Sequence, residues 1–501
     1  MANPLFRKKS LTGLLAEAAD PLDDATTLKR SLGRWALIAL GVGAIIGAGL
    51  FVRTAAAAAN NAGPAVTYGF IIAGIGCAFA GLCYAEFASM VPISGSAYTY
   101  SYTTMGELVA WIIGWDLVLE YALGAATVGI AWSEYLNKLL GYFGTEIPYQ
   151  WCHSPFNSMT AADGSVVHGI INLPAIFIIT ALTWLLIRGM KGSSFVNSLI
   201  VITKVAIVIL FIVFGWGFIN PENHVPFIPE ATKYVDDQGV THNFGGLLGI
   251  LGAAGVVFFA FIGFDAVSTA AQEAKNPKKD MPWGILGSLV ICTILYILFS
   301  YVLTGVASTE DFRTNGKEAS VTYAIQTYME GYSWLGKLVT VAILAGFSSV
   351  ILVMLMGQSR VFYSMSRDGL VPKIFSDIHK KHRTPYKSNI LFCVFVGLFA
   401  AFIPGDIVGD MTSIGTLFAF ILVCAGVWML RVKNPEIPRQ FKTPFVPLVP
   451  ILGIIVCTAM IYGLGWPNWL RLGIWMLIGV VIYFAYGRHH SKLNQKDATE
   501  S

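Results

Sequence analysis

The stretch "GVGAIIGAGLF", residues 41–51, decides how this chain folds, because it places four glycines within nine residues of a long apolar run. A bilayer-spanning helix needs about 20 apolar residues, and each glycine inside a helix costs roughly 1 kcal/mol relative to alanine. The stretch therefore predicts a helix that enters the membrane and is weakened inside it.

The composition indicates a polytopic membrane protein. The chain is 55% hydrophobic and only 12% charged over 501 residues, and many apolar runs approach the length of a spanning helix. We expect an all-α membrane protein without a water-soluble domain, since the longest loops are shorter than an independent domain. Twelve spans are expected, at residues 35–58, 65–89, 106–136, 171–188, 194–218, 246–274, 283–308, 334–364, 388–404, 410–430, 446–464 and 470–486.

Charge sets the expected orientation in the cell (plasma) membrane. The polar segment 1–34 precedes an apolar run too long for a signal peptide, so no cleavage is expected. With this segment and the tail 487–501 both cytoplasmic, most of the 33 Lys and Arg residues fall on the cytoplasmic side, as the positive-inside rule requires. The basic stretches "KNPKK" (275–279) and "HKKHR" (379–383) then indicate topology and anionic lipid headgroups, and no nucleic acid.

The cysteines and the polar residues indicate no covalent framework and no cofactor. Six of the seven cysteines fall within expected spans and Cys152 lies in an outer loop, so no disulfide framework follows. A free thiol at Cys152 is favoured over an intermolecular bridge. No group of three or four oxygen side chains forms a dedicated metal site, and we expect no metal, no cofactor and no enzymatic activity.

A second interrupted span lies five spans later, in "GVVFFAFIGFDAVSTAAQE" at residues 255–273. In the expected topology the first span runs outward and the sixth runs inward. Weak helices at matching places in opposite orientation indicate an inverted repeat, here residues 35–218 and 246–430, with two further helices at 446–486. Small residues also allow close helix packing, but two such spans at matching places favour unwinding.

Unwinding inside a membrane has a chemical use. The peptide N–H and C=O groups at the break lose their helical partners, and the N–H end attracts a carboxylate while the C=O end attracts an ammonium. A free amino acid carries both groups one carbon apart. We assign its carboxylate to the amides of Gly47, Ala48 and Gly49, with Ile45 and Ile46 as the unwound approach. We assign its ammonium to the carbonyls of Phe259, Ala260 and Ile262, with Gly263 permitting the break.

Lys204 is left deep within a span, in "VNSLIVITKVAIVILFIVFGWGF". It lies about 16 Å from either end of the expected helix at 1.5 Å per residue, too far for its side chain to reach the headgroups. An ammonium is costly at that depth, and burial favours its neutral form, so it can lose its proton near neutrality. Lys204 is therefore a candidate for carrying a coupling proton, and a permanently paired structural lysine is the alternative.

Carboxylates in the third span are further candidates. "GWDLVLEYALG" places Glu120 at the midpoint of this span and Asp116 one turn away on the same face. Glu120 is a candidate proton acceptor, counter-ion for Lys204 or wall of a substrate pocket. A protonated, hydrogen-bonded core glutamate explains it equally well.

Four other polar residues lie in or near the expected breaks and spans. Asp265 is within the second break and is a candidate for holding the unwound segment or relaying protons, whereas Glu86 is near the cytoplasmic end of its helix and is expected to be structural. Ser348 and Ser349 in the eighth span are candidates for accepting a hydrogen bond from the lysine ammonium, and back-bonding within their own helix is the alternative. An ammonium in the place of a coupled cation favours protons over sodium.

Two long stretches resemble a known family. "GLCYAEFASMVPISGSAYTYSYTTMGELVAWIIGWDLVLEYALG" (81–124) and "FFAFIGFDAVSTAAQEAKNPKKDMPWGI" (258–285) are similar to the cationic amino acid transporter branch of the amino acid–polyamine–organocation superfamily. The similarity runs through most of residues 33–430 and is greatest to bacterial twelve-span members. It implies a five-plus-five inverted repeat, the LeuT-like fold, with substrate between spans 1, 3, 6, 8 and 10.

The resemblance also implies roles for single residues. "GAG" at 47–49 matches the family's carboxylate site and "FFAFIG" at 258–263 its amine site, with Phe259 as the aromatic that gates the site from outside. Lys204 aligns with the lysine that replaces the sodium ion of sodium-coupled relatives. Ser348 and Ser349 match the hydroxyl neighbours of that lysine.

One departure from the branch concerns the substrate. The eighth span reads "VILVMLM", and Met354 would crowd a pocket that must pass a guanidinium. We therefore expect a proton-coupled importer of small neutral L-amino acids such as alanine. The alternatives are a facilitator or exchanger of arginine and lysine, and an amino-acid sensor that does not transport. The sequence leaves open whether a small membrane subunit accompanies the chain.

Overall fold

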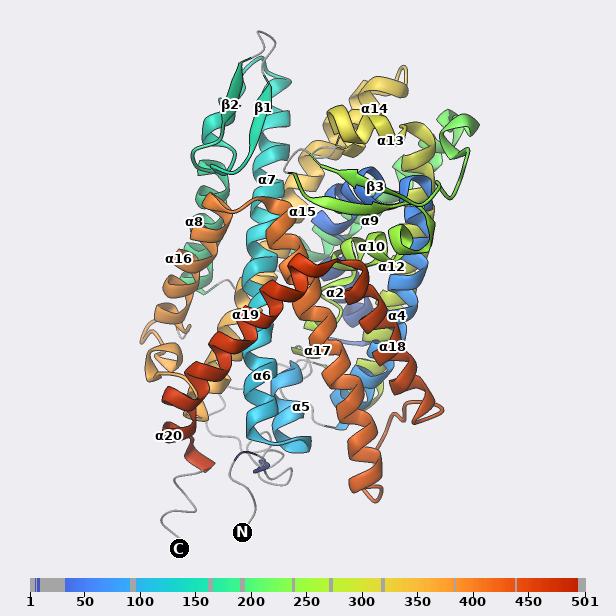
Figure 1. Cartoon of the computed structure of the whole chain (residues 1–501). Helices are drawn as coiled ribbons and strands as arrows, with labels where there is room; N and C mark the ends of the chain where they lie inside the picture. Colours follow the sequence, from blue (N-terminus) through green and yellow to red (C-terminus); the bar gives the residue numbers. More distant parts are fainter. Residues whose placement is uncertain are drawn as a thin grey trace, which may run out of the picture.

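The protein is a bundle of long helices capped at one end by two short β-hairpins (Figure 1). The structure is a computed structural model, and it describes residues 5, 7–9, 32–90, 96–160, 165–189, 194–236, 239–269, 274–316, 320–382, 384–437 and 439–493. Both hairpins lie at the end of the bundle opposite α5 (Ser96–Thr104) and α20 (Arg488–His490).

The described helices and strands have these bounds. The helices are α2 Arg34–Ile45, α3 Thr54–Ala57, α4 Val66–Met90, α5 Ser96–Thr104, α6 Glu107–Val118, α7 Gly124–Gly141, α8 Leu173–Arg188, α9 Ser194–Gly215, α10 Gly246–Val257, α11 Ala266–Thr269, α12 Pro277–Val306, α13 Thr309–Asp311, α14 Ser320–Tyr328, α15 Ser333–Arg367, α16 Tyr386–Phe402, α17 Gly405–Lys433, α18 Leu448–Gly463, α19 Trp466–Ile482 and α20 Arg488–His490. The strands are β1 Ser158–Thr160, β2 Val166–His168, β3 Thr232–Val235 and β4 Thr241–Phe244. Strands β1 and β2 pair antiparallel, as do β3 and β4.

Each of the twelve expected spans overlaps an apolar helix. Among the described residues, 7 helical segments are long and apolar enough to cross a membrane, and shorter apolar helices occupy Arg34–Ile45, Leu173–Arg188, Gly246–Phe261, Tyr386–Phe402 and Leu448–Gly463. The class of fold, a mostly helical membrane protein, agrees with the expectation. The count of twelve crossings stays a prediction, because the shorter helices have fewer than 18 residues.

The first expected span is interrupted where its glycines cluster. Helix α2 ends at Ile45, and Ile46 has extended backbone with φ −70° and ψ 107°. The chain resumes as a π-helical turn over Gly49–Arg53. Gly49 is required by packing, since an added Cβ would collide with the backbone of Ala260 in the second interrupted span.

The sixth expected span is interrupted at matching depth. Helix α10 ends at Val257, a 3₁₀ turn follows over Phe258–Phe261, and Ile262 leaves the helix with ψ 133°. Gly263 has φ 115°, which residues with a side chain rarely adopt, and an added Cβ would lie 2.8 Å from the Ala44 carbonyl oxygen. The glycines thus permit both breaks and let the two broken helices touch.

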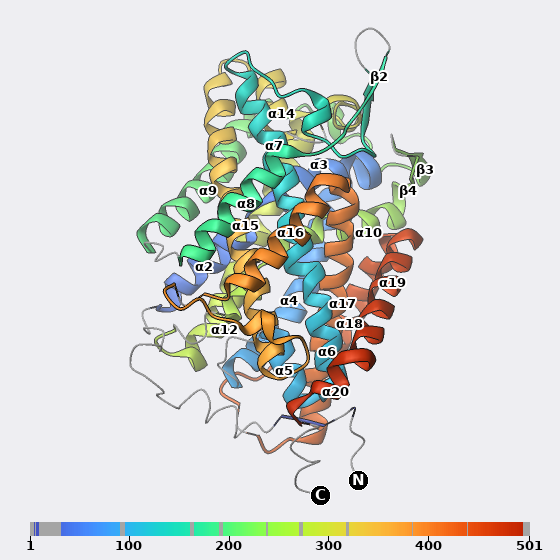
Figure 2. The same ribbon diagram turned by 90° about the vertical axis from the view of Figure 1, so that its left-hand side faces the viewer.

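The helices pack in two groups. In one group α12 packs against α2 and α4, and α4 packs against α10, so both broken helices share these neighbours. In the other group α7 packs against α15, α8 and α17. Figure 2 shows α16 alongside α8 in this second group. Helix α17 also contacts α4 and α10, so it lies between the two groups.

Candidate functional site

The two interruptions form one buried site. Six of the residues assigned to it are at most 3% exposed, namely Ile45, Ile46, Ala48, Phe259, Ala260 and Ile262. Among the described residues, no backbone hydrogen bond outside the helices uses the Gly47 amide or the Ile262 carbonyl. These two groups are therefore candidates for binding a ligand.

Tyr296 of α12 joins the two breaks. Its hydroxyl lies 3.1 Å from the Ile45 carbonyl oxygen and 3.0 Å from the Ala260 carbonyl oxygen, and it is the donor to both. The Phe259 carbonyl accepts a hydrogen bond from the Ile262 amide at 3.3 Å. Two of the three carbonyls assigned to an ammonium, those of Phe259 and Ala260, therefore already accept a hydrogen bond from the protein. Each of them has a second lone pair that can accept another hydrogen bond. Sequence reasoning missed Tyr296.

Lys204 is buried, as expected, and binds the first broken helix. Its side chain is 3% exposed, and Nζ donates a hydrogen bond of 2.9 Å to the Gly43 carbonyl in the last turns of α2. Its stem lies against Gly346 of α15, where an added Cβ would be 2.7 Å from the Lys204 Cε. The lysine therefore links α9, the interrupted helix and α15.

The hydroxyls expected beside the lysine have other partners. Ser348 accepts a hydrogen bond from the Trp132 indole at 3.1 Å and donates to the Leu344 carbonyl at 2.9 Å, which is the back-bonding alternative. The structure thus does not bring Ser348 to the lysine ammonium. Ser349 is half-buried on the same helix.

Three of the candidate carboxylates, Asp116, Glu120 and Asp265, are buried. Glu120 is on a π-helical turn, Leu119–Leu123, that interrupts the third expected span, and Asp116 is one turn before it. Asp265 accepts a hydrogen bond from the Tyr121 hydroxyl. Among the described residues no ion pair joins Lys204 to Glu120, so the counter-ion hypothesis for Glu120 has no support in this conformation. π-helical turns are frequent at functional sites.

Met354 lies one turn beyond the contact between α15 and the first break. An added Cβ on Gly47 would be 3.2 Å from Val350 of α15. An added Cβ on Gly124 of α7 would be 3.0 Å from the Met354 sulfur and 3.5 Å from Thr412 of α17. Met354 therefore fills the space between α7, α15 and α17 next to the break.

A cavity of about 170 Å³ leads from the first break toward the hairpin end of the bundle. Its lining includes Ala48 next to the first break, and Arg53, Glu134, Asp236 and Asp406 bring charge to its wall. We call this cavity the vestibule. It connects the residues assigned to a carboxylate with the end of the bundle that carries both hairpins.

Arg53 forms a charge cluster with Asp406 and Asp410 at the start of α17. We call it the outer charge cluster because it lies toward the hairpin end of the bundle. Nη1 lies 2.7 Å from Asp406, Nη2 bonds Asp410, and the second Asp410 oxygen accepts from the Asn468 amide at 3.1 Å. The Arg53 side chain is 3% exposed. Sequence reasoning overlooked Arg53, although it lies inside the expected span 35–58 and only four residues after Gly49.

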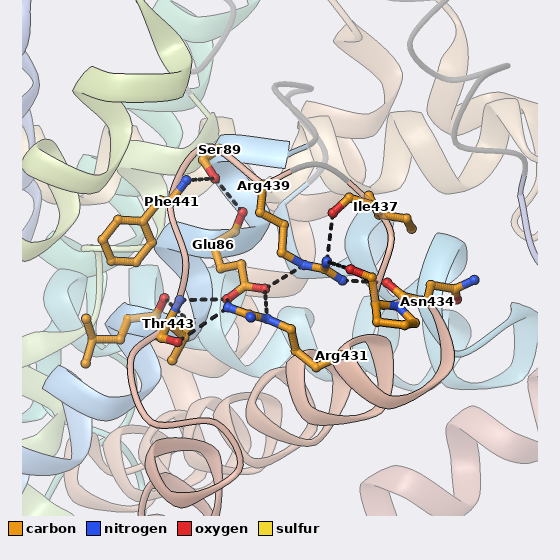
Figure 3. A network of polar contacts seen from close by, with 10 residues as sticks. Glu86, Ser89, Arg431, Asn434, Ile437, Arg439, Phe441 and Thr443 are labelled. Atoms are coloured by element: carbon orange, nitrogen blue, oxygen red, sulfur yellow. Dashed lines mark hydrogen bonds and ion pairs between the residues drawn. The ribbon is translucent and has the colours of Figure 1, made fainter.

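Glu86 forms the inner charge cluster at the other end of α17 (Figure 3). Arg431 of α17 binds both its oxygens, at 2.8 and 2.9 Å, and Arg439 lies 3.1 Å away. The Thr443 amide adds a bond of 2.8 Å from the loop between α17 and α18. Glu86 is fully buried and has a structural role here, as expected from its position.

A buried polar site between two interrupted helices, in a bundle of apolar helices, is the arrangement of a membrane transporter. Comparison with known proteins makes this specific: the chain belongs to the amino acid permease family, whose model matches residues 32–485. The resemblance to the amino acid–polyamine–organocation superfamily and its cationic amino acid transporter branch is thereby confirmed.

Three relatives align with this chain over most of their own length. The branched-chain amino acid permease BcaP of Bacillus subtilis (strain 168) is 44% identical over 99% of this chain and 100% of its own. The methylthioribose transporter of the same organism is 40% identical over 98% and 99% of the two chains. Cationic amino acid transporter 9, chloroplastic, of Arabidopsis thaliana is 35% identical over 90% of this chain and 76% of its own. All three are named as transporters or permeases.

Proposed function

We propose that this permease imports neutral aliphatic L-amino acids across the cell membrane together with protons, by alternating access. The observation that carries the proposal is the contact between the two interrupted helices, where Gly49 meets Ala260 and a free amide and carbonyl flank the contact. An amino acid is the ligand whose two charged ends match the two broken helix ends.

Binding uses peptide groups on both helices. The carboxylate accepts hydrogen bonds from the amides of Gly47, Ala48 and Gly49, and the ammonium donates to the carbonyls of Ile262 and Phe259. Each charge-assisted bond contributes about 1.5–3 kcal/mol, which offsets part of the cost of removing a zwitterion from water. The Ala260 carbonyl, shared with Tyr296, is the weakest of the assigned acceptors. Phe259 then closes over the ligand from the outside.

Lys204 couples this step to protons. A charged Lys204 holds the Gly43 carbonyl and so holds the end of α2 against α9. A neutral amine makes a weaker bond, because charge-assisted hydrogen bonds are about twice as strong as neutral ones. Loss of the proton therefore loosens the first half of the broken helix, which is the half that must move when the site opens to the cytoplasm. Glu120 and Asp265 are candidate acceptors for that proton.

The substrate proposal depends on Met354. A long thioether between α7, α15 and α17 leaves room for a small or branched aliphatic side chain beside the break and excludes a guanidinium. The relative with 44% identity is named for branched-chain amino acids, in line with this choice. Transport of arginine or lysine is the second candidate, because relatives such as cationic amino acid transporter 4 of Arabidopsis thaliana, 29% identical, are named for cationic substrates.

The proposal includes the membrane arrangement. Twelve crossings with an inverted repeat over 35–218 and 246–430, and with both termini cytoplasmic, would place the hairpins outside. Both hairpins do lie together at one end of the bundle, opposite α20. The partners of the protein in this arrangement are an L-amino acid, protons and the lipid bilayer.

Counterflow in proteoliposomes tests the function. The panel holds alanine, valine, leucine, isoleucine, arginine, lysine and methylthioribose, each at two external pH values. We expect counterflow of the neutral aliphatic amino acids and accumulation that rises with an inward proton gradient. Uptake that does not change with external pH and is blocked by arginine would support a facilitator or exchanger of arginine and lysine. A sensor would give no counterflow, and a response to methylthioribose alone would remove the amino-acid assignment.

Met354→Ser tests the substrate pocket. Shortening the side chain should open the space between α7, α15 and α17 and admit arginine, with a gain of about tenfold in its competition for uptake, or about 1.4 kcal/mol. Met356→Ser, two residues further on the same helix and only partly buried, is the matched control. An unchanged substrate range in the Met354 variant would remove this residue from the specificity argument.

A further inference from the structure

Helix α8 ends against the loop that joins α15 to α16, at the edge of the bundle (Figure 1). At the start of α8 the Asn172 amide donates to the Ala401 carbonyl in the last turn of α16. At the other end the Thr384 hydroxyl donates to the Ile187 carbonyl at 2.8 Å. The two helices are therefore antiparallel, and the loop is attached to the last turn of α8. In the proposed membrane arrangement this end is cytoplasmic.

Arg188 and a tryptophan occupy the end of α8. The Arg188 guanidinium lies 3.8 Å from the centre of the Trp184 ring, which is one turn earlier on the same helix. The Trp184 side chain is 51% exposed, and tryptophan is enriched at the depth of the lipid headgroups. A cation–π contact orients the guanidinium and leaves its charge in place, so Arg188 can still bind an anion.

The loop presents two lysines beside this arginine. Lys380 and Lys381 are exposed on a turn, and the His379 Nδ1 atom accepts hydrogen bonds from the amides of Lys381 and His382, both at 3.2 Å. A Cβ added to Gly189, the residue after α8, would lie 3.3 Å from the His382 carbonyl oxygen. The turn that carries the lysines therefore lies against the end of α8.

The positive charge of this region is not balanced by nearby carboxylates. Asp377, the acidic residue of the same loop, pairs with Lys387 at 2.5 Å. In the described part of the chain, neither Arg188 nor the two lysines of the turn form an ion pair. We call Trp184, Arg188, Lys380 and Lys381 the basic surface. Its three cations are available to an external anion.

Apolar side chains lie on both helices next to the basic surface. Helices α8 and α16 pack against each other. Leu185 on α8 and Ile390 and Val394 on α16 are 36%, 48% and 58% exposed. An anion with hydrocarbon chains can cover these side chains while its charged group binds the cations, whereas a soluble anion can use only the cations.

We propose that the basic surface binds the headgroup of an anionic phospholipid, with the acyl chains of the lipid against α8 and α16. Lys and Arg clusters directly beside a membrane helix attract anionic lipids, and a guanidinium can bind two phosphate oxygens at once. A zwitterionic headgroup carries a cation of its own, which the three cations of the surface repel. The bound lipid joins the end of α8 to the loop after α15.

Native mass spectrometry of the detergent-purified full chain, titrated with dioleoyl phosphatidylglycerol, tests this site. The wild-type protein should bind one such lipid about tenfold more tightly than dioleoyl phosphatidylcholine, and inorganic phosphate at the same concentration should not displace it. Arg188→Gln should weaken binding about fivefold, and Lys380→Gln combined with Lys381→Gln about 25-fold.

A matched double variant distinguishes the site from general attraction to a basic end of the bundle. Lys275→Gln combined with Lys278→Gln removes two exposed lysines next to the start of α12 and should leave the tight lipid in place. Equal loss in the two double variants would overturn the proposal. So would equal binding of phosphatidylglycerol and phosphatidylcholine by the wild-type protein, which requires no variant. Displacement of the lipid by inorganic phosphate would show that the surface binds free phosphate, and it would overturn the proposal too.

Discussion

The two ends of α17 carry charge clusters of opposite composition. At the outer end one guanidinium, Arg53, lies between two carboxylates, and at the inner end one carboxylate, Glu86, lies between two guanidiniums. The outer cluster includes a half-exposed carboxylate on a cavity, whereas Glu86 is fully buried and also accepts a backbone amide. The outer cluster therefore has one partner on a cavity wall, whereas the carboxylate of the inner cluster is bound on both oxygens and buried.

The clusters also bind different parts of the bundle to α17. The outer cluster holds the second half of the interrupted first helix, and the inner cluster holds the end of α4 together with the loop before α18. Because α17 lies between the two helix groups, each cluster joins one group to the other at one end of the bundle. At the hairpin end one of the carboxylates is half-exposed, and at the opposite end the carboxylate is fully buried.

The largest expected effect is on proton-driven accumulation, and it comes from replacing Lys204. With a gradient of about one pH unit, a one-proton symporter accumulates substrate up to about tenfold. Lys204→Ala should reduce this accumulation ratio to about one, while counterflow persists and the melting temperature stays close to that of the wild type. Accumulation in proteoliposomes at two external pH values measures it, with Lys373→Ala, an exposed lysine, as control. Unchanged accumulation would show that coupling does not pass through this lysine.

The next largest effect is expected at the inner cluster. Glu86→Gln leaves Arg431 and Arg439 without the carboxylate that both bind, and removing one partner of a buried ion pair costs about 3–5 kcal/mol. Thermal unfolding of the detergent-purified protein should show a clear loss of stability. The matched control is Glu310→Gln, because the Glu310 side chain is 71% exposed in its pair with Arg313. If both variants melted alike, the inner cluster would stabilise the protein no more than the Glu310–Arg313 pair does.

A smaller loss of stability is expected from Asp410→Asn. Asp410 is the fixed partner of Arg53, and its neutral amide keeps the shape of the side chain but removes a charge-assisted hydrogen bond, at a cost of about 1.5–3 kcal/mol. In the same unfolding measurement, the loss of stability should be smaller than for Glu86→Gln and larger than for Asp406→Asn. A loss equal to that of Glu86→Gln would contradict the difference between the two ends of α17.

The smallest loss of stability is expected from Asp406→Asn. Its carboxylate is half-exposed, and pairs in contact with water contribute about 0–1 kcal/mol. Melting should therefore change little. A large destabilisation would mean that Asp406 contributes to stability as a buried partner of Arg53 would.

Sequence reasoning predicted the parts of the fold that depend on local composition. Both interruptions were predicted from the glycines in 41–51 and 255–273 and from the extended apolar runs. The burial of Lys204 was predicted from its depth within its helix. Each of these follows from residues close together in the chain, where helix propensity and hydropathy act.

The charge clusters and the neighbours of the lysine depend on tertiary packing. Arg53 and Asp406 are separated by 353 residues and Glu86 and Arg431 by 345, so no local pattern pairs them. Ser348 is expected beside Lys204, but its hydroxyl is bonded within α15 and to Trp132, and the lysine donates to the Gly43 carbonyl. An arginine four residues after a membrane glycine was the one available sign of the outer cluster.

Tyr296 gives the two helix breaks a shared constraint. A phenol has a single hydrogen, and here two carbonyls from different broken helices, Ile45 and Ala260, compete for it. Strengthening one bond weakens the other, because the hydrogen can point toward only one oxygen at a time. The ends of the two broken helices are thereby coupled through a single hydroxyl group.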